Sequence, residues 1–323
     1  MNMGIIGAGM IVHDLFNFID QIPSITVQAL CSKPSHQQKL DKLREEHAIT
    51  SIYTDYQALL NDPKVDTIYI GLPNHLHFTY TKLALESGKN VICEKPFTAT
   101  LEEFTVLKTR ALEKQLILLE AISNQYAKQY QLIRDSLSEV GTVKIVECNY
   151  SQYSSRYSDF QKGIVHSVFD PAKAGGALMD INIYNIHFTI GLFGAPKQVT
   201  YMPNIEKGID TSGILLLDYN SFKCVCIGAK DSTSPNHISI QGDKGSIHLS
   251  GSSNDITNFE LTSLSRQAIM SSLNYPPHRM YDEFVAFNEI INRNDLDKAF
   301  AMLEHSEKVM QVIDSAQKQM LEH

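Results

Sequence analysis

A lysine at the end of an apolar strand is the clearest candidate for chemistry in this sequence. Residues 91–93 are apolar and predict a strand, which ends in Glu94, Lys95 and Pro96. Ligands bind at the carboxyl ends of the strands in an open parallel sheet, so Lys95 would point into a crevice. Pro96 restricts Lys95 to extended geometry, and Glu94 can hold the ammonium. The alternative is an ordinary surface Glu-Lys pair before a turn proline, which contributes at most about 1 kcal/mol.

A second group of reactive side chains lies further along the chain. Asp180, Tyr184 and His187 are spaced i, i+4 and i+7 within 178–192, which predicts a helix with all three on one face. A carboxylate, a phenol and an imidazole are costly to bury on an apolar helix without a purpose. The alternative is a core helix that carries a few satisfied polar groups.

A glycine-rich turn near the N-terminus predicts a dinucleotide site. A short apolar strand precedes Gly7 and Gly9, and apolar residues at helical spacing follow them. Gly7 makes the tight turn, Gly9 admits a phosphate, and Met10 and Ile11 are expected contacts at the positive end of the helix. Val12 replaces the third glycine of the dinucleotide fingerprint, which affects helix–strand packing more than phosphate contact.

The end of the second predicted strand, residues 26–31, favours NADP over NAD. Ser32 and Lys33 stand where an NAD enzyme usually has Asp or Glu for the ribose hydroxyls. A 2′-phosphate prefers hydroxyl and cationic groups, although a stray surface lysine is the alternative. We therefore expect NADP as the cofactor, with NAD as the second choice.

Polar residues also follow the buried strand predicted at 67–70. They cluster where a doubly wound sheet binds its ligand, and the alternative for them is simple helix capping. The cofactor contacts predicted in this segment are Leu72, Pro73, Asn74 and His75. Along the whole sequence no set of His, Cys, Asp and Glu residues has the spacing of a metal site, so no metal is predicted.

The element pattern predicts two domains. Strands alternate with helices through residues 1–120, which is typical of a doubly wound parallel Rossmann sheet in an α/β protein. Residues 121–323 read as an α+β domain with a mostly antiparallel open sheet, because strand signals alternate with turns over 196–260. We expect one face of that sheet to pack against the helix at 178–192. The other face would be exposed unless paired, so we predict a homodimer or homotetramer through the C-terminal sheet. Residues 154–170 read as a loop over the substrate crevice.

Composition excludes several classes of partner. The 323 residues are 43% hydrophobic and carry a net charge of −8, which argues against a nucleic acid or an anionic membrane surface. No apolar run approaches the roughly 20 residues of a membrane span. The N-terminus has no basic and apolar leader. Of the five cysteines, Cys224 and Cys226 share one face of a predicted strand but lack the partners of a zinc site. These features predict a cytoplasmic protein with reduced, mostly buried thiols.

Taken together, four motifs resemble those of the Gfo/Idh/MocA family of oxidoreductases. They are Gly-Ala-Gly at 7–9, Pro-Asn-His-Leu-His at 73–77, Glu-Lys-Pro at 94–96, and the glycine-led segment 175–187. The resemblance covers both halves of the chain. It implies hydride transfer between a nicotinamide cofactor and a small molecule: a sugar, a polyol or a related cyclic alcohol or carbonyl compound.

Two departures from the family pattern refine this hypothesis. Asn182 stands where many members have Gly, and Tyr184 stands where inositol dehydrogenase-like members have His. The Asp-to-Tyr spacing is similar to that of glucose–fructose oxidoreductase and the dimeric dihydrodiol dehydrogenases, in which Tyr is the acid/base. The resemblance thus implies Tyr184 as acid/base and Lys95 as its electrostatic partner. Asp180 would orient Lys95 or a substrate hydroxyl, and His187 would be a secondary contact.

Two other functions stay open on the sequence. Some members of this fold family are glycosidases that retain NAD and show hydrolysis without net cofactor reduction. A non-catalytic nucleotide-sensing module would keep the fold and lose turnover. The presence of both Lys95 and Tyr184 argues against that second alternative.

Overall fold

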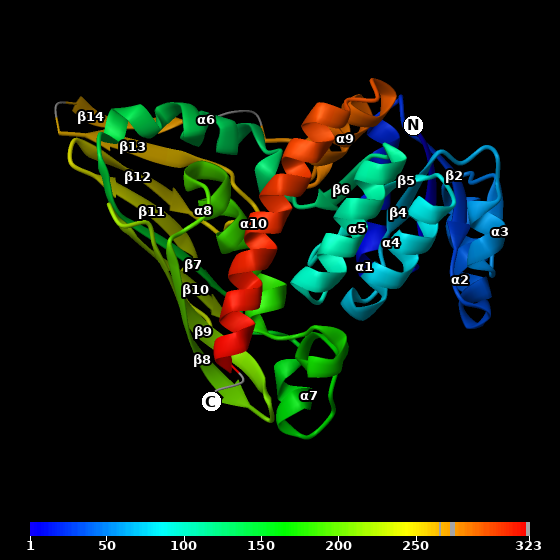
Figure 1. The fold of residues 1–323 in the computed structure, drawn as a ribbon, viewed down its shortest axis with the longest axis horizontal. Coiled ribbons are helices and arrows are strands. Elements are labelled where there is room, and N and C mark those ends of the chain that lie inside the picture. The colour runs from blue at the N-terminus through cyan, green and yellow to red at the C-terminus, as the bar shows by residue number, and fades with distance from the viewer. Residues whose placement is uncertain (265, 272–274, 321–323) are drawn as a thin grey trace. The chain divides into compact units, whose positions relative to one another are not determined.

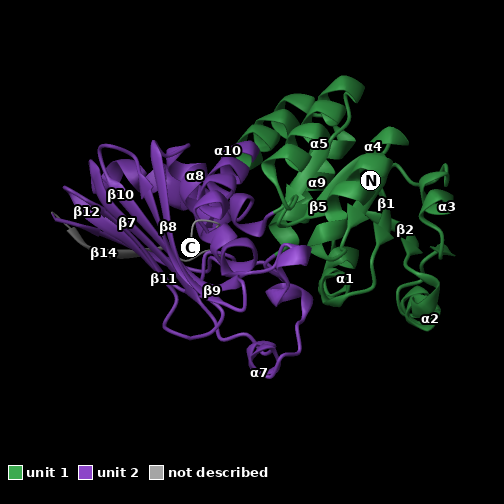
Figure 2. Cartoon of the chain, turned by 60° about the horizontal axis from the view of Figure 1, so that its bottom comes forward, with its two compact units in different colours: residues 1–121, 280–306 green, residues 122–279, 307–323 purple. Residues whose placement is uncertain are grey.

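The computed structural model describes residues 1–264, 266–271 and 275–320, and the chain divides into two compact units (Figure 2). Unit 1 consists of Met1–Ala121 and Met280–Ser306, and unit 2 of Ile122–Arg279 and Glu307–His323. This division differs from the predicted domains 1–120 and 121–323, because the segment 280–306 returns to the first unit.

The aromatic face of helix α9 (Tyr281–Asn292) explains this return. Phe284 and Phe287 are fully buried. The Phe284 ring packs edge-on against Phe18 and Tyr69, with centroids 5.7 and 5.6 Å apart. Edge-to-face aromatic pairs of this kind add about 0.5–1.5 kcal/mol beyond their burial. The core of unit 1 is therefore completed by residues more than 160 positions beyond its last strand, which ends at Ala121.

Unit 1 is built on a parallel sheet whose described strands lie in the order β3-β2-β1-β4-β5-β6. The direction of winding reverses between β1 and β4. Such a switch point leaves a ligand crevice at the carboxyl ends of the strands. The strands are β1 (Asn2–Ile6), β2 (Thr26–Cys31), β3 (Ser51–Tyr53), β4 (Thr67–Ile70), β5 (Asn90–Glu94) and β6 (Leu118–Ala121). The predicted doubly wound parallel sheet is confirmed.

Helices connect these strands, and α4 and α5 run side by side (Figure 1). The sequence specifies the start of α5 locally: the Thr100 hydroxyl accepts from the Glu103 amide at 3.2 Å, and the Glu103 carboxylate accepts from the Ala99 amide at 3.0 Å. This is a reciprocal cap of the Thr-x-x-Glu type. The connecting helices are α1 (Met10–Phe16), α2 (Gln37–Glu46), α3 (Tyr56–Leu60), α4 (His77–Glu86) and α5 (Leu101–Lys114). Helix α10 (Leu296–Met320) begins in unit 1 and ends in unit 2.

Unit 2 is built on a sheet with the described strand order β14-β13-β12-β11-β7-β10-β9-β8. Strands β7 and β10 are parallel, and all other described neighbours are antiparallel, as predicted. The strands are β7 (Val143–Ser151), β8 (Gln198–Glu206), β9 (Ile209–Asp218), β10 (Lys223–Ala229), β11 (His237–Gly242), β12 (Gly245–Ser250), β13 (Phe259–Ser263) and β14 (Arg266–Ser271). The helices of unit 2 include α6 (Lys128–Ser136), α7 (Tyr157–Gln161) and α8 (Ile183–Phe193).

The two faces of this sheet differ because side chains alternate along each strand. On one face the side chains are buried and α8 packs against β7 and β10. On the other face, apolar side chains of β7, β8 and β9 are more than a third exposed: Ile145, Met202, Ile214 and Leu216. The predicted one-sided covering is thus present within unit 2.

The segment expected as a loop at 154–170 is instead a folded lobe. We call residues 154–176 the aromatic lobe; it contains α7 and two short 3-10 helices, η6 (Ser167–Phe169) and η7 (Pro171–Lys173). Its small core consists of Tyr157, Phe160 and Phe169, which pack with Ile209 of β9. The sequence pattern missed this because the lobe buries aromatic residues without helical or strand periodicity.

Two further properties concern the whole described chain. Within the ranges described, no helix combines the length and the apolar character required to cross a bilayer. All five cysteines are buried free thiols, as predicted for their burial.

Candidate active site

The glycine turn lies at the switch point of the unit 1 sheet. Gly7 has a φ of +128°, and a Cβ on it would lie 2.2 Å from the carbonyl oxygen of Gly71, so only glycine fits. Gly9 caps α1, and a Cβ there would meet nothing within 4 Å, which leaves space for a ligand. Val12 is fully buried, and its side chain packs against Gly71. The missing third glycine therefore affects packing at the end of β4 and not the open side of the turn.

The side chains expected at this turn differ in exposure. Met10 is 78% exposed and Ile11 is half-buried at the start of α1. Contact of Met10 and Ile11 with a dinucleotide stays a prediction.

A basic cluster follows β2. Ser32 is buried and Lys33 is exposed. The Ser32 hydroxyl lies 2.9 Å from Nδ1 of His36, a residue that the sequence pattern did not single out. Partial burial and the charges of Lys33 and Lys39 lower the pKa of His36. Lys33, His36 and Lys39 thus form a basic group after β2.

The loop after β4 is held from beneath by a buried histidine. Leu72 and Asn74 are half-buried, whereas Pro73 and His75 are exposed. His77 is fully buried, and its two ring nitrogens lie 2.8 Å from the carbonyl oxygens of Leu72 and Pro96. Neither Asn74 nor His75 caps a helix here, since η3 (Asn74–Leu76) and α4 have no side-chain cap. The capping alternative is therefore not supported.

Lys95 follows directly on the carboxyl end of β5. The side chain is half-buried, and the peptide bond to Pro96 is cis. Glu94 is buried, and its carboxylate accepts a 2.7 Å hydrogen bond from the hydroxyl of Tyr69 on β4. His77 bonds the Pro96 carbonyl, so the loops after β4 and β5 are tied together. Unit 1 thus brings the glycine turn, residues 72–75 and Lys95 to one edge of its sheet.

In unit 2, the predicted helix exists but begins with an irregular turn. Residues Leu178–Asn182 form a π-helical turn, η8, which continues into α8. Such π turns occur frequently at functional sites. Asp180 is half-buried, Tyr184 is 7% exposed, and His187 has no exposed surface. The burial of His187 therefore does not favour the predicted secondary contact with a substrate.

The backbone of this helix is held by buried amides. The Asn124 side chain donates to the carbonyl oxygen of Tyr184 at 2.9 Å, and the Gln125 side chain donates to that of His187 at 2.9 Å. The Asn182 amide, at the position where many family members have glycine, donates to the Cys226 carbonyl at 3.2 Å. Gly228 opposite makes room, because a Cβ there would lie 2.6 Å from that of Asn182.

Asp180 is paired with a lysine that the sequence pattern did not single out. The ammonium of Lys230, at the end of β10, lies 2.8 Å from Oδ2 of Asp180. It also donates to the carbonyl oxygen of Val168 at 2.7 Å and lies 4.5 Å from the centre of the Phe169 ring. Lys230 is only 1% exposed. One signal could have found it: like Lys95, it directly follows an apolar strand.

A buried carboxylate stabilises the start of η8. Asp210 of β9 accepts from the Leu178 amide and from the Tyr201 hydroxyl, each at 2.7 Å. Burial raises the pKa of Asp210 to about 6, while these two hydrogen bonds and the charge of Lys230 oppose the rise. Gly176 (φ +103°) lies against it, and a Cβ there would be 2.0 Å from the carboxylate. These contacts fix the backbone immediately before Asp180.

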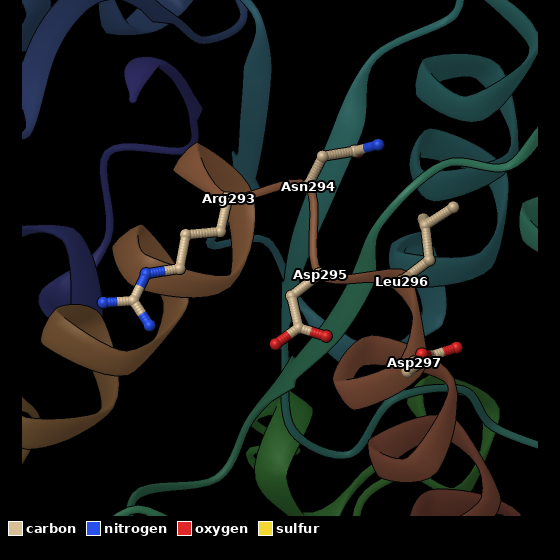
Figure 3. A pocket seen from close by; sticks show the side chains of 5 residues that line it. All are labelled: Arg293, Asn294, Asp295, Leu296 and Asp297. Carbon is tan, nitrogen blue, oxygen red and sulfur yellow. The ribbon is translucent and has the colours of Figure 1, made fainter.

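A recess of about 420 Å³ lies elsewhere in unit 1, at the connection from α9 to α10. Its lining side chains, which Figure 3 shows pointing in different directions, are Arg293, Asn294, Asp295, Leu296 and Asp297. Its polar groups do not converge, so we do not assign a ligand to it. Among the residues that the structure describes, no group of three or more His, Cys, Asp and Glu could hold a metal ion.

Comparisons with protein families match both halves of the chain. Residues 1–122 match the family described as "Oxidoreductase family, NAD-binding Rossmann fold". Residues 130–248 match the "GFO/IDH/MocA C-terminal domain".

Curated relatives cover most of the chain. An uncharacterized oxidoreductase, YgjR of Escherichia coli, is 31% identical over 248 residues, which is 76% of this chain and 75% of the relative. The scyllo-inositol 2-dehydrogenase (NADP(+)) IolU of Bacillus subtilis is 29% identical over 99% of this chain and 97% of its own length. Human trans-1,2-dihydrobenzene-1,2-diol dehydrogenase is 28% identical over 77% of this chain and 74% of its own.

Solved structures share the fold. KijD10, a 3-ketoreductase from Actinomadura kijaniata in complex with NADP and TDP-benzene, superposes with a TM-score of 0.85 at 20% identity. The superposition covers 98% of this chain and 97% of KijD10. The glycine turn, the strand-terminal lysine and the Asp-Tyr helix therefore belong to an NAD(P)-dependent oxidoreductase of the Gfo/Idh/MocA family.

Proposed function

We propose that this enzyme transfers a hydride between NADP and a CH–OH/C=O pair on a sugar, polyol or related cyclic alcohol. Tyr184 carries the proposal: it is a mostly buried phenol, and the π turn before it carries Asp180, a carboxylate paired with Lys230. The names of the relatives support the substrate class, since an inositol and a dihydrodiol are both cyclic alcohols.

The residues at the edge of the unit 1 sheet fit a nicotinamide dinucleotide. The space beside Gly9 and the half-buried Asn74 and Lys95 suit a pyrophosphate and a nicotinamide ribose. Ser32 and Lys33, a hydroxyl and a cation where an NAD enzyme usually has an acid, suit the 2′-phosphate of NADP better than a free ribose hydroxyl. When bound, the nicotinamide ring supplies or accepts the hydride.

Tyr184 gives or takes the hydroxyl proton in this mechanism. A phenol ordinarily ionises near pH 10, so a cation beside it is needed for proton transfer near neutrality. Lys95 is the proposed source of that field, and it also holds the substrate oxygen or the nicotinamide ribose. Asp180 orients a substrate hydroxyl. His187 is fully buried on α8 within unit 2, and its role is to pack the helix.

The test is a fluorescence titration of cofactor-free protein with NADPH and with NADH, followed by a panel of cyclic polyols and sugars. The chain contains no Trp, so the nicotinamide signal is free of indole interference. We expect tighter binding of NADPH and reversible NADP reduction with at least one cyclic polyol. Equal or tighter binding of NADH, together with glycoside hydrolysis and no net change in cofactor, would replace this proposal with the NAD-retaining glycosidase.

We also propose that the open face of the unit 2 sheet binds a second copy of the chain. Ile214 and Leu216 of β9 pair in register with Ile227 and Val225 of β10, and Met202 of β8 pairs with Ile214. The apolar side chains therefore form one patch. A Leu216→Lys substitution is expected to shift the mass measured by light scattering to that of a monomer. An unchanged oligomer in that variant would place the interface elsewhere.

A further inference from the structure

Lys230 occupies a position in unit 2 that neither the motifs nor the proposed mechanism uses. Its side chain is 2% exposed, and burial of an ammonium is costly unless several groups compensate for it. Here the compensation comes from the Asp180 carboxylate, the Val168 carbonyl oxygen and the face of the Phe169 ring. Two of these three partners belong to the aromatic lobe, and the third belongs to η8.

The backbone of Lys230 contacts the first residue of the same lobe. Its amide donates to the Thr211 carbonyl at 2.8 Å, which fixes it to β9, and its carbonyl oxygen accepts from the Ser154 amide at 2.8 Å. The side chain contacts Val168 and Phe169 in η6. One residue therefore contacts both the start of the aromatic lobe and its η6 segment.

The core of the lobe connects Lys230 to a second lysine through two stacked rings. The rings of Phe160 and Phe169 are stacked with centroids 4.8 Å apart and planes 18° from parallel. Lys230 lies over one side of this pair, and Lys207 lies over the other, 4.9 Å from the Phe160 ring. Cation–ring contacts of this kind stabilise most when they are desolvated, as the one with Lys230 is.

Asp180 is the group whose position this arrangement fixes. Its amide bonds to the Gly176 carbonyl at 3.1 Å, at the junction of the lobe and η8. One carboxylate oxygen faces Lys230, while the side chain keeps 30% of its surface exposed. An ionised carboxylate held at one oxygen by a buried cation has a fixed direction and can still meet a ligand.

We propose that Lys230 is a positioning residue that fixes Asp180 and couples the aromatic lobe to it, so that the lobe sets the geometry with which Asp180 meets the substrate. The role of Asp180 toward the substrate rests on the proposed function. The coupling between Lys230, the lobe and η8 does not.

The kinetic test compares Lys230→Met with Lys207→Met. Both variants remove a cation from the same stacked ring pair, but Lys207 lies 42% exposed and its ammonium bonds the carbonyl oxygens of Phe160 and Gln161, away from η8. We expect Lys230→Met to lower kcat by about 10²-fold, the scale of a displacement near 1 Å at a reacting group. NADPH affinity should stay unchanged, and Lys207→Met should retain kcat within about twofold.

A double-variant cycle separates positioning from general stability. Because Lys230 acts through Asp180, Lys230→Met in an Asp180→Asn background should lower kcat no further, and this background also removes the unpaired carboxylate that could prevent folding. Lys230→Arg should recover part of the activity lost in Lys230→Met, because it keeps the charge. Full additivity of the two substitutions, or wild-type kcat in Lys230→Met, would overturn the proposal.

Hydrogen exchange tests the coupling without any substrate. The amides of residues 176–182 should exchange faster in Lys230→Met and in Asp180→Asn, and at the wild-type rate in Lys207→Met. Unchanged exchange there in Lys230→Met rejects the coupling. Faster exchange in a protein that oxidises no cyclic alcohol supports the coupling and counts against the proposed function alone.

Discussion

Two lysines, one in each unit, directly follow a strand of apolar residues, and the structure gives them different surroundings. Lys95 follows β5 of a parallel sheet and stays half-buried. Lys230 follows β10 and is 1% exposed, with its ammonium on Asp180 and on the Val168 carbonyl oxygen.

What covers the end of the strand makes the difference. The aromatic lobe closes over the end of β10, so the chain itself supplies the partners of Lys230. The end of β5 lies at the edge of the unit 1 sheet that also carries the glycine turn, where the fold leaves room for a cofactor. A strand-terminal lysine is therefore a candidate for ligand binding only when the chain does not bury it.

The largest expected effect is on the rate of hydride transfer at the Lys95 site. Lys95→Ala and Tyr184→Phe should each slow hydride transfer by about 10²-fold or more, because each removes a group from proton transfer. Stopped-flow measurement of NADPH oxidation or formation gives this rate, and a fluorescence titration should show cofactor affinity little changed. Near-normal turnover in either variant would remove that residue from the mechanism.

The next effect separates Lys95 from Lys230 by their contributions to stability. Lys230→Met should lower the free energy of unfolding of unit 2 by about 3 kcal/mol, because it leaves the Asp180 carboxylate without its buried cation. Lys95→Met, at a half-buried position, should cost less than about 1 kcal/mol. Urea unfolding followed by circular dichroism measures both. Equal losses would mean that burial does not distinguish the two sites.

A pH effect of at most about 3 kcal/mol is expected from Asp210, which Lys230 also influences, because one unit of pKa corresponds to about 1.4 kcal/mol. Burial raises the Asp210 pKa from 3.8 to about 6, so the folded state binds a proton more tightly than the unfolded state between these values. This contribution to stability is present below pH 4 and is lost as the pH rises to 6. Asp210→Asn should flatten this part of the stability curve, and Lys230→Met should move its upper end to higher pH. A wild-type pH slope in Asp210→Asn would assign it to another group.

The smallest effect concerns a third lysine near a strand end, the exposed Lys33 after β2. Lys33→Ala should weaken NADPH binding by about tenfold and leave NADH binding unchanged, because only NADPH carries the 2′-phosphate. Fluorescence titration with both cofactors measures this difference. Equal weakening of both would show that Lys33 does not contact the 2′-phosphate.

The sequence by itself determined the features that depend on local physics. Apolar strand runs, the Gly7 turn and the helical spacing of Asp180, Tyr184 and His187 act over a few residues, so they predicted the parallel sheet and the places of Lys95 and Tyr184. The mostly antiparallel second sheet followed from its alternating strands and turns in the same way.

Only the tertiary structure decided the return of α9 to unit 1, the core of the aromatic lobe, and the pairing of Lys230 with Asp180. The paired charges are 50 residues apart and meet because β10, β9 and the lobe enclose the same space. Burial of a charge depends on such long-range contacts, which residue types and spacing along one segment do not contain.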